Sequence, residues 1–227
     1  MISVVIAAFA AGVIHVLSGV DHLAAVAPLS VERRARTWLT GFRWGLGHAA
    51  GVVIVGALSF LFREVLPLEA LSSWAERGVG VMLIGIGVWG LRHALTRHVH
   101  VHEHVHDGNR HAHIHVHAEA TAHSHVTVET PAHAHTHAAF AVGTIHGLAG
   151  SSHFLVALPT LALPTAMQAF AYLVAYGLGT ISAMVLFSIA VAWFARSVSA
   201  TRADAYRSVM VGCSVVSLVV GGFWLAA

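Results

Sequence analysis

Apolar residues gather in six long runs, which are separated by shorter polar or charged segments. A helix that crosses a bilayer needs about 20 apolar residues, and each run is long enough for that. The sequence therefore predicts six transmembrane helices, at residues 2–28, 38–62, 74–95, 138–160, 165–195 and 207–226. The first and fifth runs are longer than a straight helix requires, which predicts a tilt or a break in each.

Composition agrees with a membrane protein, since 57% of the residues are apolar and only 10% are charged. Soluble domains average about 25% charged residues. The segment from Met1 to Ile14 contains no Lys or Arg, so we interpret the first run as a retained helix rather than a cleaved signal peptide. The single cysteine, Cys213, allows no disulfide and no Cys-x-x-Cys site within these residues.

One motif occurs twice, 131 positions apart. The segment from Gly12 to His22 and the segment from Gly143 to His153 share the frame G-x-I-H-x-L-x-G-x-x-H. A proline follows six residues after each copy, at Pro28 and Pro159. Both copies lie inside apolar runs, where polar side chains are expensive to bury and usually serve a function.

A second pair of segments extends the repeat. The sequence from Phe42 to His48 resembles that from Val174 to Thr180, at nearly the same offset from the upstream motif. Each half then holds three runs, so the second half must be inserted upside down relative to the first, as in many secondary transporters. We predict an all-α polytopic membrane protein with two inverted three-helix repeats, residues 1–95 and 138–227.

The connecting segment, residues 96–137, is of another kind, since 14 histidines occur between residues 98 and 137, mostly at every second position. Such a tract is typical of metal binding rather than of a plain solvated linker. Imidazole ligands suit zinc, nickel, cobalt and copper. The alternation with Val and Ala could indicate a strand, but no core for it is evident, so we expect disorder without metal.

Arginine predicts the orientation, because the chain has no lysine. Ten arginines lie on the side of the loops after runs one, three and five, and two lie on the other side. The positive-inside rule then places both termini outside an inner or plasma membrane and the histidine-rich loop in the cytoplasm.

The candidate metal ligands are polar residues at hydrocarbon depth: His15, Asp21, His22, His48, His146 and His153. An Asp near the centre of a spanning helix costs about 2.5–3.5 kcal/mol, which a bound cation would offset. A single membrane histidine often serves only as an interhelical hydrogen-bond donor. Five histidines with one acid, in a repeated frame, favour a metal site instead. Small residues around His48 could alternatively serve close helix packing.

The spacing of the histidines constrains that site. Seven residues separate the two histidines of each motif, which puts them on one helix face but about 10.5 Å apart along the axis. Two nitrogens on one metal ion must lie within about 4 Å of each other. We therefore expect runs one and four to break at Gly19 and Gly150, so that the ligands fold around one central ion. Intact helices would instead imply separate sites along a path.

The His15…Asp21-His22 block resembles the signature of the nickel/cobalt permeases, with five residues before the Asp-His pair where that pattern has four. The Arg43-Trp-Gly-Leu-Gly-His48 block and the His146…His153 pair are similar to the related exporters and urease-accessory-type permeases. This resemblance implies a carrier of six to eight helices that moves Ni²⁺ or Co²⁺ without ATP hydrolysis.

The predicted function is secondary transport of a divalent transition metal, nickel or cobalt, with zinc also compatible with the ligands. The alternatives are a non-covalent haem protein, since paired membrane histidines can ligate haem iron, and a metal sensor or storage protein without transport. We expect no enzyme activity, no organic cofactor and no nucleic-acid partner. A cytoplasmic metallochaperone is a candidate partner. The direction of transport and the oligomeric state stay open.

Overall fold

A computed structural model describes residues 1–32, 36–62, 68–96, 98–106, 109–117, 134–149, 162–199 and 203–226. Seven helices occur in these ranges: α1 (Ile2–Ser18), α2 (Val20–Glu32), α3 (Trp38–Phe62), α4 (Leu68–Thr96), α5 (Ala134–Leu148), α7 (Ala166–Ser199) and α8 (Ala203–Ala226). Two strands, β1 (His98–His106) and β2 (Asn109–His117), form a hairpin between α4 and α5. The helices coincide closely with the apolar runs of the sequence.

Three helices are long and apolar enough to cross a membrane, over Ser73–Thr96, Ala166–Ser199 and Asp204–Ala226. The α1–α2 pair adds a fourth span if the two helices are counted as one broken span. Large apolar side chains such as Leu186, Trp193 and Phe223 are exposed, as lipid-facing residues would be. The chain is therefore a polytopic membrane protein, with three to four spans among the described residues; the second half of the fourth apolar run lies outside them.

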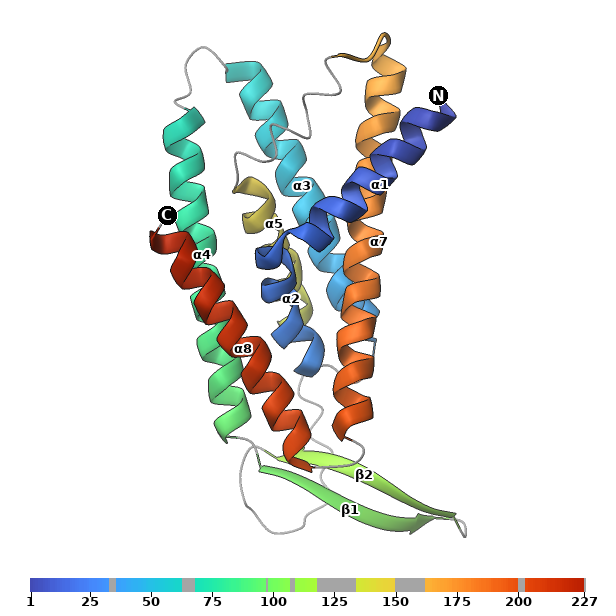
Figure 1. The fold of residues 1–227 in the computed structure, drawn as a ribbon, viewed down its shortest axis with the longest axis vertical. Helices are drawn as coiled ribbons and strands as arrows, with labels where there is room; N and C mark the ends of the chain where they lie inside the picture. Colours follow the sequence, from blue (N-terminus) through green and yellow to red (C-terminus); the bar gives the residue numbers. More distant parts are fainter. Residues whose placement is uncertain are drawn as a thin grey trace.

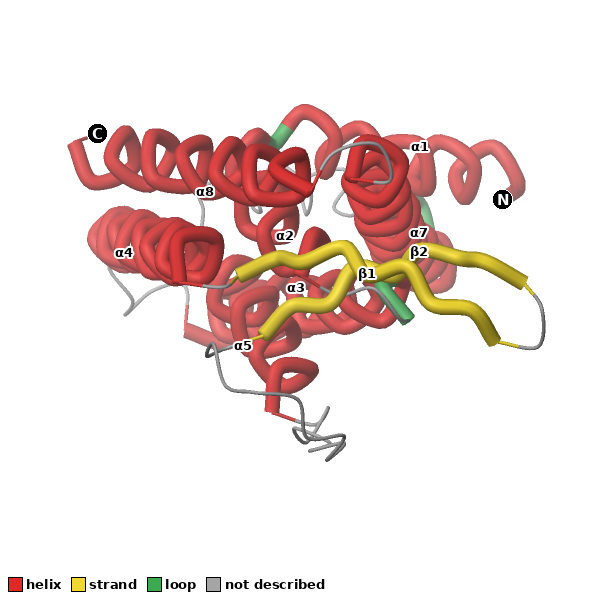
Figure 2. The backbone as a smooth tube through the Cα atoms, turned by 90° about the horizontal axis from the view of Figure 1, so that it is seen from below, coloured by secondary structure: helices red, strands yellow, loops and turns green. Residues whose placement is uncertain are grey.

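Helix α2 is the inner element of the bundle. It contacts α3, α4, α5, α7 and α8, and the view along the bundle shows it enclosed by other helices (Figure 2). Around it, α1 packs along α7, α5 along α3, and α4 along α8 (Figure 1). Small residues suit this enclosed position, and Ala24, Ala25 and Ala27 are buried.

Proline 28 lies inside α2 and has no N–H to donate to the carbonyl of Ala24, four residues earlier. The hydroxyl of Ser217 in α8 donates to this carbonyl, with an oxygen–oxygen distance of 2.7 Å. A neighbouring helix thus satisfies the backbone group that proline leaves open, as is required in the bilayer core.

Glycines lie where the helices cross. A Cβ added at Gly12 of α1 would overlap the Tyr176 carbonyl of α7, and one at Gly143 of α5 would overlap the Trp44 carbonyl of α3. In the opposite direction, a Cβ at Gly179 would overlap the carbonyl of Phe9, and one at Gly47 that of Phe140. The absence of side chains at these positions allows the backbones to approach closely.

The hairpin differs from the disorder that we expected for residues 96–137. Strand β1 pairs with β2 in antiparallel register, from His98 opposite His117 to His106 opposite Asn109. It lies at the end of the bundle away from both termini (Figure 1). Alternating His and Val or Ile residues gives each strand two distinct faces, which is the pattern of a strand rather than of a random linker. Residues 118–133 lie outside the described part of the chain.

Candidate metal centre

The first transmembrane run is broken at Gly19, as the spacing of its histidines predicted. Helix α1 ends at Ser18, α2 begins at Val20, and the two helices are bent by 73°. Gly19 has extended backbone angles, φ −80° and ψ 95°. A Cβ at Gly19 would collide with the His22 ring and approach Asp21 Oδ1 to 3.0 Å, so glycine is needed here for close approach. The equivalent residue Gly150 lies outside the described residues.

The break lies near the middle of the membrane-spanning length. Figure 1 shows the α1–α2 junction at mid-height of the long helices, with α2 running along the bundle axis. From Asp21 to the last residue of α2, Glu32, a helix rises about 16 Å. That is about half of a 30 Å hydrocarbon core. The two ends of the broken helix therefore meet close to the bilayer midplane.

The bend brings together residues that an unbroken helix would separate. His22 Nε2 lies 3.2 Å from His15 Nε2, although the two residues are seven apart. His22 Nδ1 lies 2.9 Å from Asp21 Oδ1. Two nitrogens on one tetrahedral ion with bonds near 2.1 Å are about 3.4 Å apart. The His15–His22 pair is therefore spaced almost as a bound ion requires.

Histidines from two other helices complete the cluster. His146 of α5 places its Nε2 3.1 Å from Asp21 Oδ2, and its ring centroid is 4.5 Å from that of His22. His48 of α3 has its ring centroid 5.0 Å from that of His22 and 5.8 Å from that of His15. His22, His48 and His146 are buried, with 5%, 1% and 2% of their surface exposed. Four segments thus converge on one enclosed point.

Two groups within this cluster could hold a metal ion: His15 with His22 and His48, and Asp21 with His22 and His146. Within each group, one ligand atom per residue lies within 4.8 Å of the others. Asp21 lies behind the first group and can accept the His22 Nδ1–H, which turns His22 Nε2 towards His15 Nε2, 3.2 Å away. A carboxylate behind a ligating imidazole is a common arrangement, because it fixes the tautomer and orientation of the ring.

The helix ends add favourable electrostatics. Asp21 lies in the first turn of α2, where the helix dipole and open N–H groups favour a negative charge. His15 lies in the last turn of α1, where the carbonyl end favours a positive charge. The break therefore supports the carboxylate on one side and a bound cation on the other.

Two aromatic residues, which the sequence analysis did not assign to the site, line the cluster. Trp44 is fully buried and stacks on His48, with ring centroids 5.0 Å apart and planes 8° apart. Tyr176 of α7 lies 5.8 Å from the His15 ring. The signal was in the repeat, because Trp44 and Tyr176 occupy equivalent positions in the two similar blocks, and Trp44 shares a helix face with His48 four residues later.

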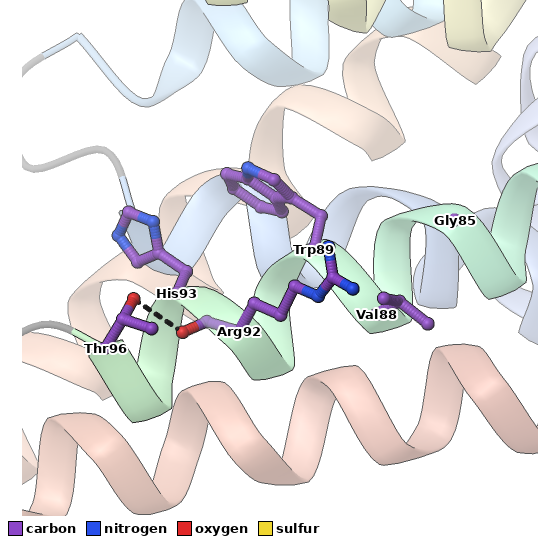
Figure 3. Close-up of a pocket in the computed structure, with 6 residues that line it drawn as sticks. All are labelled: Gly85, Val88, Trp89, Arg92, His93 and Thr96. Atoms are coloured by element: carbon purple, nitrogen blue, oxygen red, sulfur yellow. Dashed lines mark hydrogen bonds between the residues drawn. The ribbon is translucent and has the colours of Figure 1, made fainter.

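Two further features lie away from this centre. His153 is outside the described residues, so its assignment as a ligand stays a prediction. At the C-terminal end of α2, Glu32 Oε1 lies 3.8 Å from His93 Nε2 of α4. A cavity of about 430 Å³ beside this pair is lined by Gly85, Val88, Trp89, Arg92, His93 and Thr96 of α4 (Figure 3). None of these residues belongs to the histidine cluster.

Residues 4–224 match the model of the family described as cytochrome c biogenesis protein transmembrane region, so the chain belongs to that family. Two Arabidopsis thaliana relatives, the chloroplast proteins FOR GROWTH AND FERTILITY 1 and 2, are 34% and 33% identical over 177 residues, which is 78% of this chain. The chain spans less than half of their length, 46% and 43%. No solved structure matches it.

The family match corrects one expectation. The resemblance to nickel/cobalt permeases is wrong, because the match over almost the whole chain is to the cytochrome c biogenesis transmembrane family. The short His-Asp-His block produced the resemblance, and its spacing already differed by one residue from the permease pattern. Histidines and an acid near a helix break are a local solution that unrelated membrane proteins can share. The expected preference for nickel or cobalt depended on this resemblance and therefore loses its support.

Proposed function

We propose that this protein carries a divalent transition-metal ion across the membrane through the buried cluster of His15, Asp21, His22, His48 and His146. The observation that supports this most strongly is the convergence of these residues at a helix break, in two overlapping groups of three that share His22, with ligand atoms within 4.8 Å of one another in each group. A cluster of imidazoles with one carboxylate matches the ligand preferences of zinc, nickel and cobalt, but not of magnesium or calcium. The metal is the cargo, and the chain acts as a carrier rather than as an enzyme.

The geometry favours a bare ion over haem. The facing histidines lie with ring centroids 4.5–5.9 Å apart, and Trp44 stacks directly on His48. A porphyrin between two of these histidines would have to displace the other rings and the buried tryptophan. An ion needs only small rotations of side chains that are already close. The family description leaves haem as a rival for the test below.

The packing supports the inverted repeat, and with it an alternating-access carrier. Helix α1 packs on α7 while α5 packs on α3, which is the crossed pattern expected if α1 corresponds to α5 and α3 to α7. The close-approach glycines obey the same rule, since Gly12 and Gly143, like Gly47 and Gly179, make equivalent contacts. In inverted-repeat transporters, the substrate site lies near the midplane at discontinuous helices, and the repeats move around it.

Orientation follows from the arginine bias, and we keep the earlier assignment as part of the proposal. Both termini would lie outside and the hairpin in the cytoplasm. The arrangement in Figure 1, with the termini towards one end and the hairpin at the other, is compatible with this assignment.

The decisive experiment is ion flux into proteoliposomes that contain a metal-sensitive fluorophore. The full chain would carry serine in place of the 14 loop histidines, so that loop binding does not mask the central site. Zinc, nickel and cobalt would be added one at a time. We expect flux of at least one ion, and a loss of at least tenfold in His22→Ala and His146→Ala, because each removes a buried nitrogen from the cluster.

The matched control is His93→Gln, which removes a buried membrane histidine outside the cluster. It should retain flux, while His153→Ala tests the ligand that lies outside the described residues. Metal binding without flux would favour a sensor or storage protein, and a Soret band in the purified protein would favour haem. Full flux in both cluster variants would contradict the assignment of the site.

A further inference from the structure

The backbone register of the hairpin pairs histidine with histidine. Four consecutive pairs on one face consist of histidine only: His98–His117, His100–His115, His102–His113 and His104–His111. Because successive residues alternate between the two faces of a strand, these eight histidines share one face. The pairs between them belong to the other face and are mostly apolar: Val99–Val116, Val101–Ile114, Glu103–Ala112 and Val105–Arg110.

Direct opposition matters for metal binding because of distance. Residues directly opposite in an antiparallel pair have Cβ atoms about 4.5–5.5 Å apart. Neighbours on the same face of one strand are about 6.8 Å apart. Two imidazoles on one ion need nitrogens about 3.4 Å apart, which opposite residues reach most readily. A histidine-rich tract without this register would supply the same ligands in no fixed arrangement.

We propose that the hairpin is a ladder of metal sites, in which each cross-strand histidine pair gives two nitrogens to a divalent transition-metal ion. Water or an adjacent pair fills the remaining coordination positions. The ladder is a separate site from the membrane cluster and does not depend on transport.

Folding and binding are coupled in this ladder. An isolated two-stranded hairpin is at best marginally stable in water. An ion held by one residue from each strand cross-links the strands and adds its binding free energy to the hairpin. Metal occupancy therefore determines how firmly the hairpin is formed.

The hairpin is placed to act beside the transmembrane helices. It lies at the end of the bundle where α4 and α7 finish and α8 begins, and β1 contacts α8 (Figure 1, Figure 2). The ladder therefore holds its ions at the end of the bundle where α8 begins.

Two variants of the full chain, each lacking four hairpin histidines, test the register. The two-pair variant replaces His102, His104, His111 and His113 by alanine, and leaves two complete adjacent pairs. The one-strand variant replaces His98, His100, His102 and His104 by alanine, and leaves no complete pair. Both keep the same number of histidines, so composition alone predicts identical binding. The probe is Zn²⁺, counted per chain by equilibrium dialysis of protein in nanodiscs.

We expect the two-pair variant to retain about half of the zinc that the hairpin binds, and the one-strand variant to lose nearly all of it at the same free zinc concentration. Hydrogen exchange adds a second readout, in which zinc should slow exchange across residues 98–117 in the wild type and in the two-pair variant only. Equal loss in the two variants, or unchanged exchange in the wild type, would overturn the ladder. His22→Ala should leave the hairpin's capacity intact, so failure of the membrane site is read separately.

Discussion

The two halves of this chain make equivalent glycine contacts but differ in the chemistry at the centre. Gly12 and Gly143 make equivalent backbone contacts, with Tyr176 and Trp44 respectively. The similar blocks at residues 42–48 and 174–180, however, end differently: the first ends in His48 and the second in Thr180. Both residues are buried, but only the first carries a metal-binding group. We infer that close helix packing requires similar residues in both halves. The proposed ion, in contrast, needs a ligand at position 48 of α3 but none at the equivalent position 180 of α7.

The largest expected effect concerns the equivalent glycine contacts. Gly12→Ala and Gly143→Ala should each destabilise the fold by about 1–3 kcal/mol, because the new Cβ overlaps a backbone carbonyl that cannot easily move. The midpoint of thermal unfolding in detergent measures this. Gly212→Ala is the control, since an added Cβ there meets nothing within 4 Å. A tolerant Gly143 beside a sensitive Gly12 would break the equivalence of the halves.

The difference between the halves is tested by His48→Thr and Thr180→Val. His48→Thr should weaken zinc binding at the central site at least as much as loss of an outer partner, which is typically 10–100-fold. Thr180→Val should leave affinity nearly unchanged, since no ligand is lost. Both affinities are measured by competition with a chelating dye, on chains with serine at the loop histidines. Similar losses in both variants would show that the site is more symmetric than described.

Asp21→Asn separates a direct ligand from an orienting group. If Asp21 acts mainly by holding the His22 ring, affinity should fall about 10–100-fold, less than in His22→Ala. Asn keeps the shape and an acceptor oxygen, but loses the charge. A loss as complete as that of His22→Ala would place the carboxylate on the ion itself.

The smallest effects are expected at the aromatic pair. Trp44→Phe keeps a ring over His48 and should reduce affinity by less than tenfold, since stacked aromatic contacts contribute about 0.5–1.5 kcal/mol. Tyr176→Phe should have no measurable effect, because its buried hydroxyl has no hydrogen-bond partner among the described residues. A large effect of Tyr176→Phe in the same dye competition would assign this hydroxyl a role at the site.

Much of this architecture could be read from the sequence, because its determinants are local. Apolar length marked the helices, and the seven-residue spacing of His15 and His22 indicated the break at Gly19. The role of Trp44 was missed, although Trp44 shares a helix face with His48 four residues later. What could not be derived is that His22 and His146 approach its ring to 5.5 and 5.4 Å between centroids, since this depends on how α2 and α5 pack against α3. The Ser217–Ala24 bond was also invisible, because it joins residues 193 apart. The hairpin was missed because no core was evident for a strand with alternating His and Val to pack on. The pairing of the two strands itself, however, gives the hairpin two distinct faces.

The family assignment failed for a related reason. A short block of polar residues in an apolar run can indicate the kind of site, but it is a poor guide to the protein family. The same few ligand types recur wherever a protein binds a cation. The family match covers residues 4–224 instead, in a chain of which 57% is apolar.

The break at Gly19 also divides the proposed ligands between two helices. His15 belongs to α1, whereas Asp21 and His22 belong to α2, so the 3.2 Å between the His15 and His22 nitrogens depends on the angle at a single residue. An ion that fixes this distance must also fix the angle between α1 and α2. Binding and bending are then coupled. If a second event, such as the binding of a partner, favours one angle between α1 and α2, it changes the affinity for the ion by the factor by which the ion changes that event's own equilibrium. The affinity for the proposed ion therefore depends on the angle between α1 and α2 at Gly19.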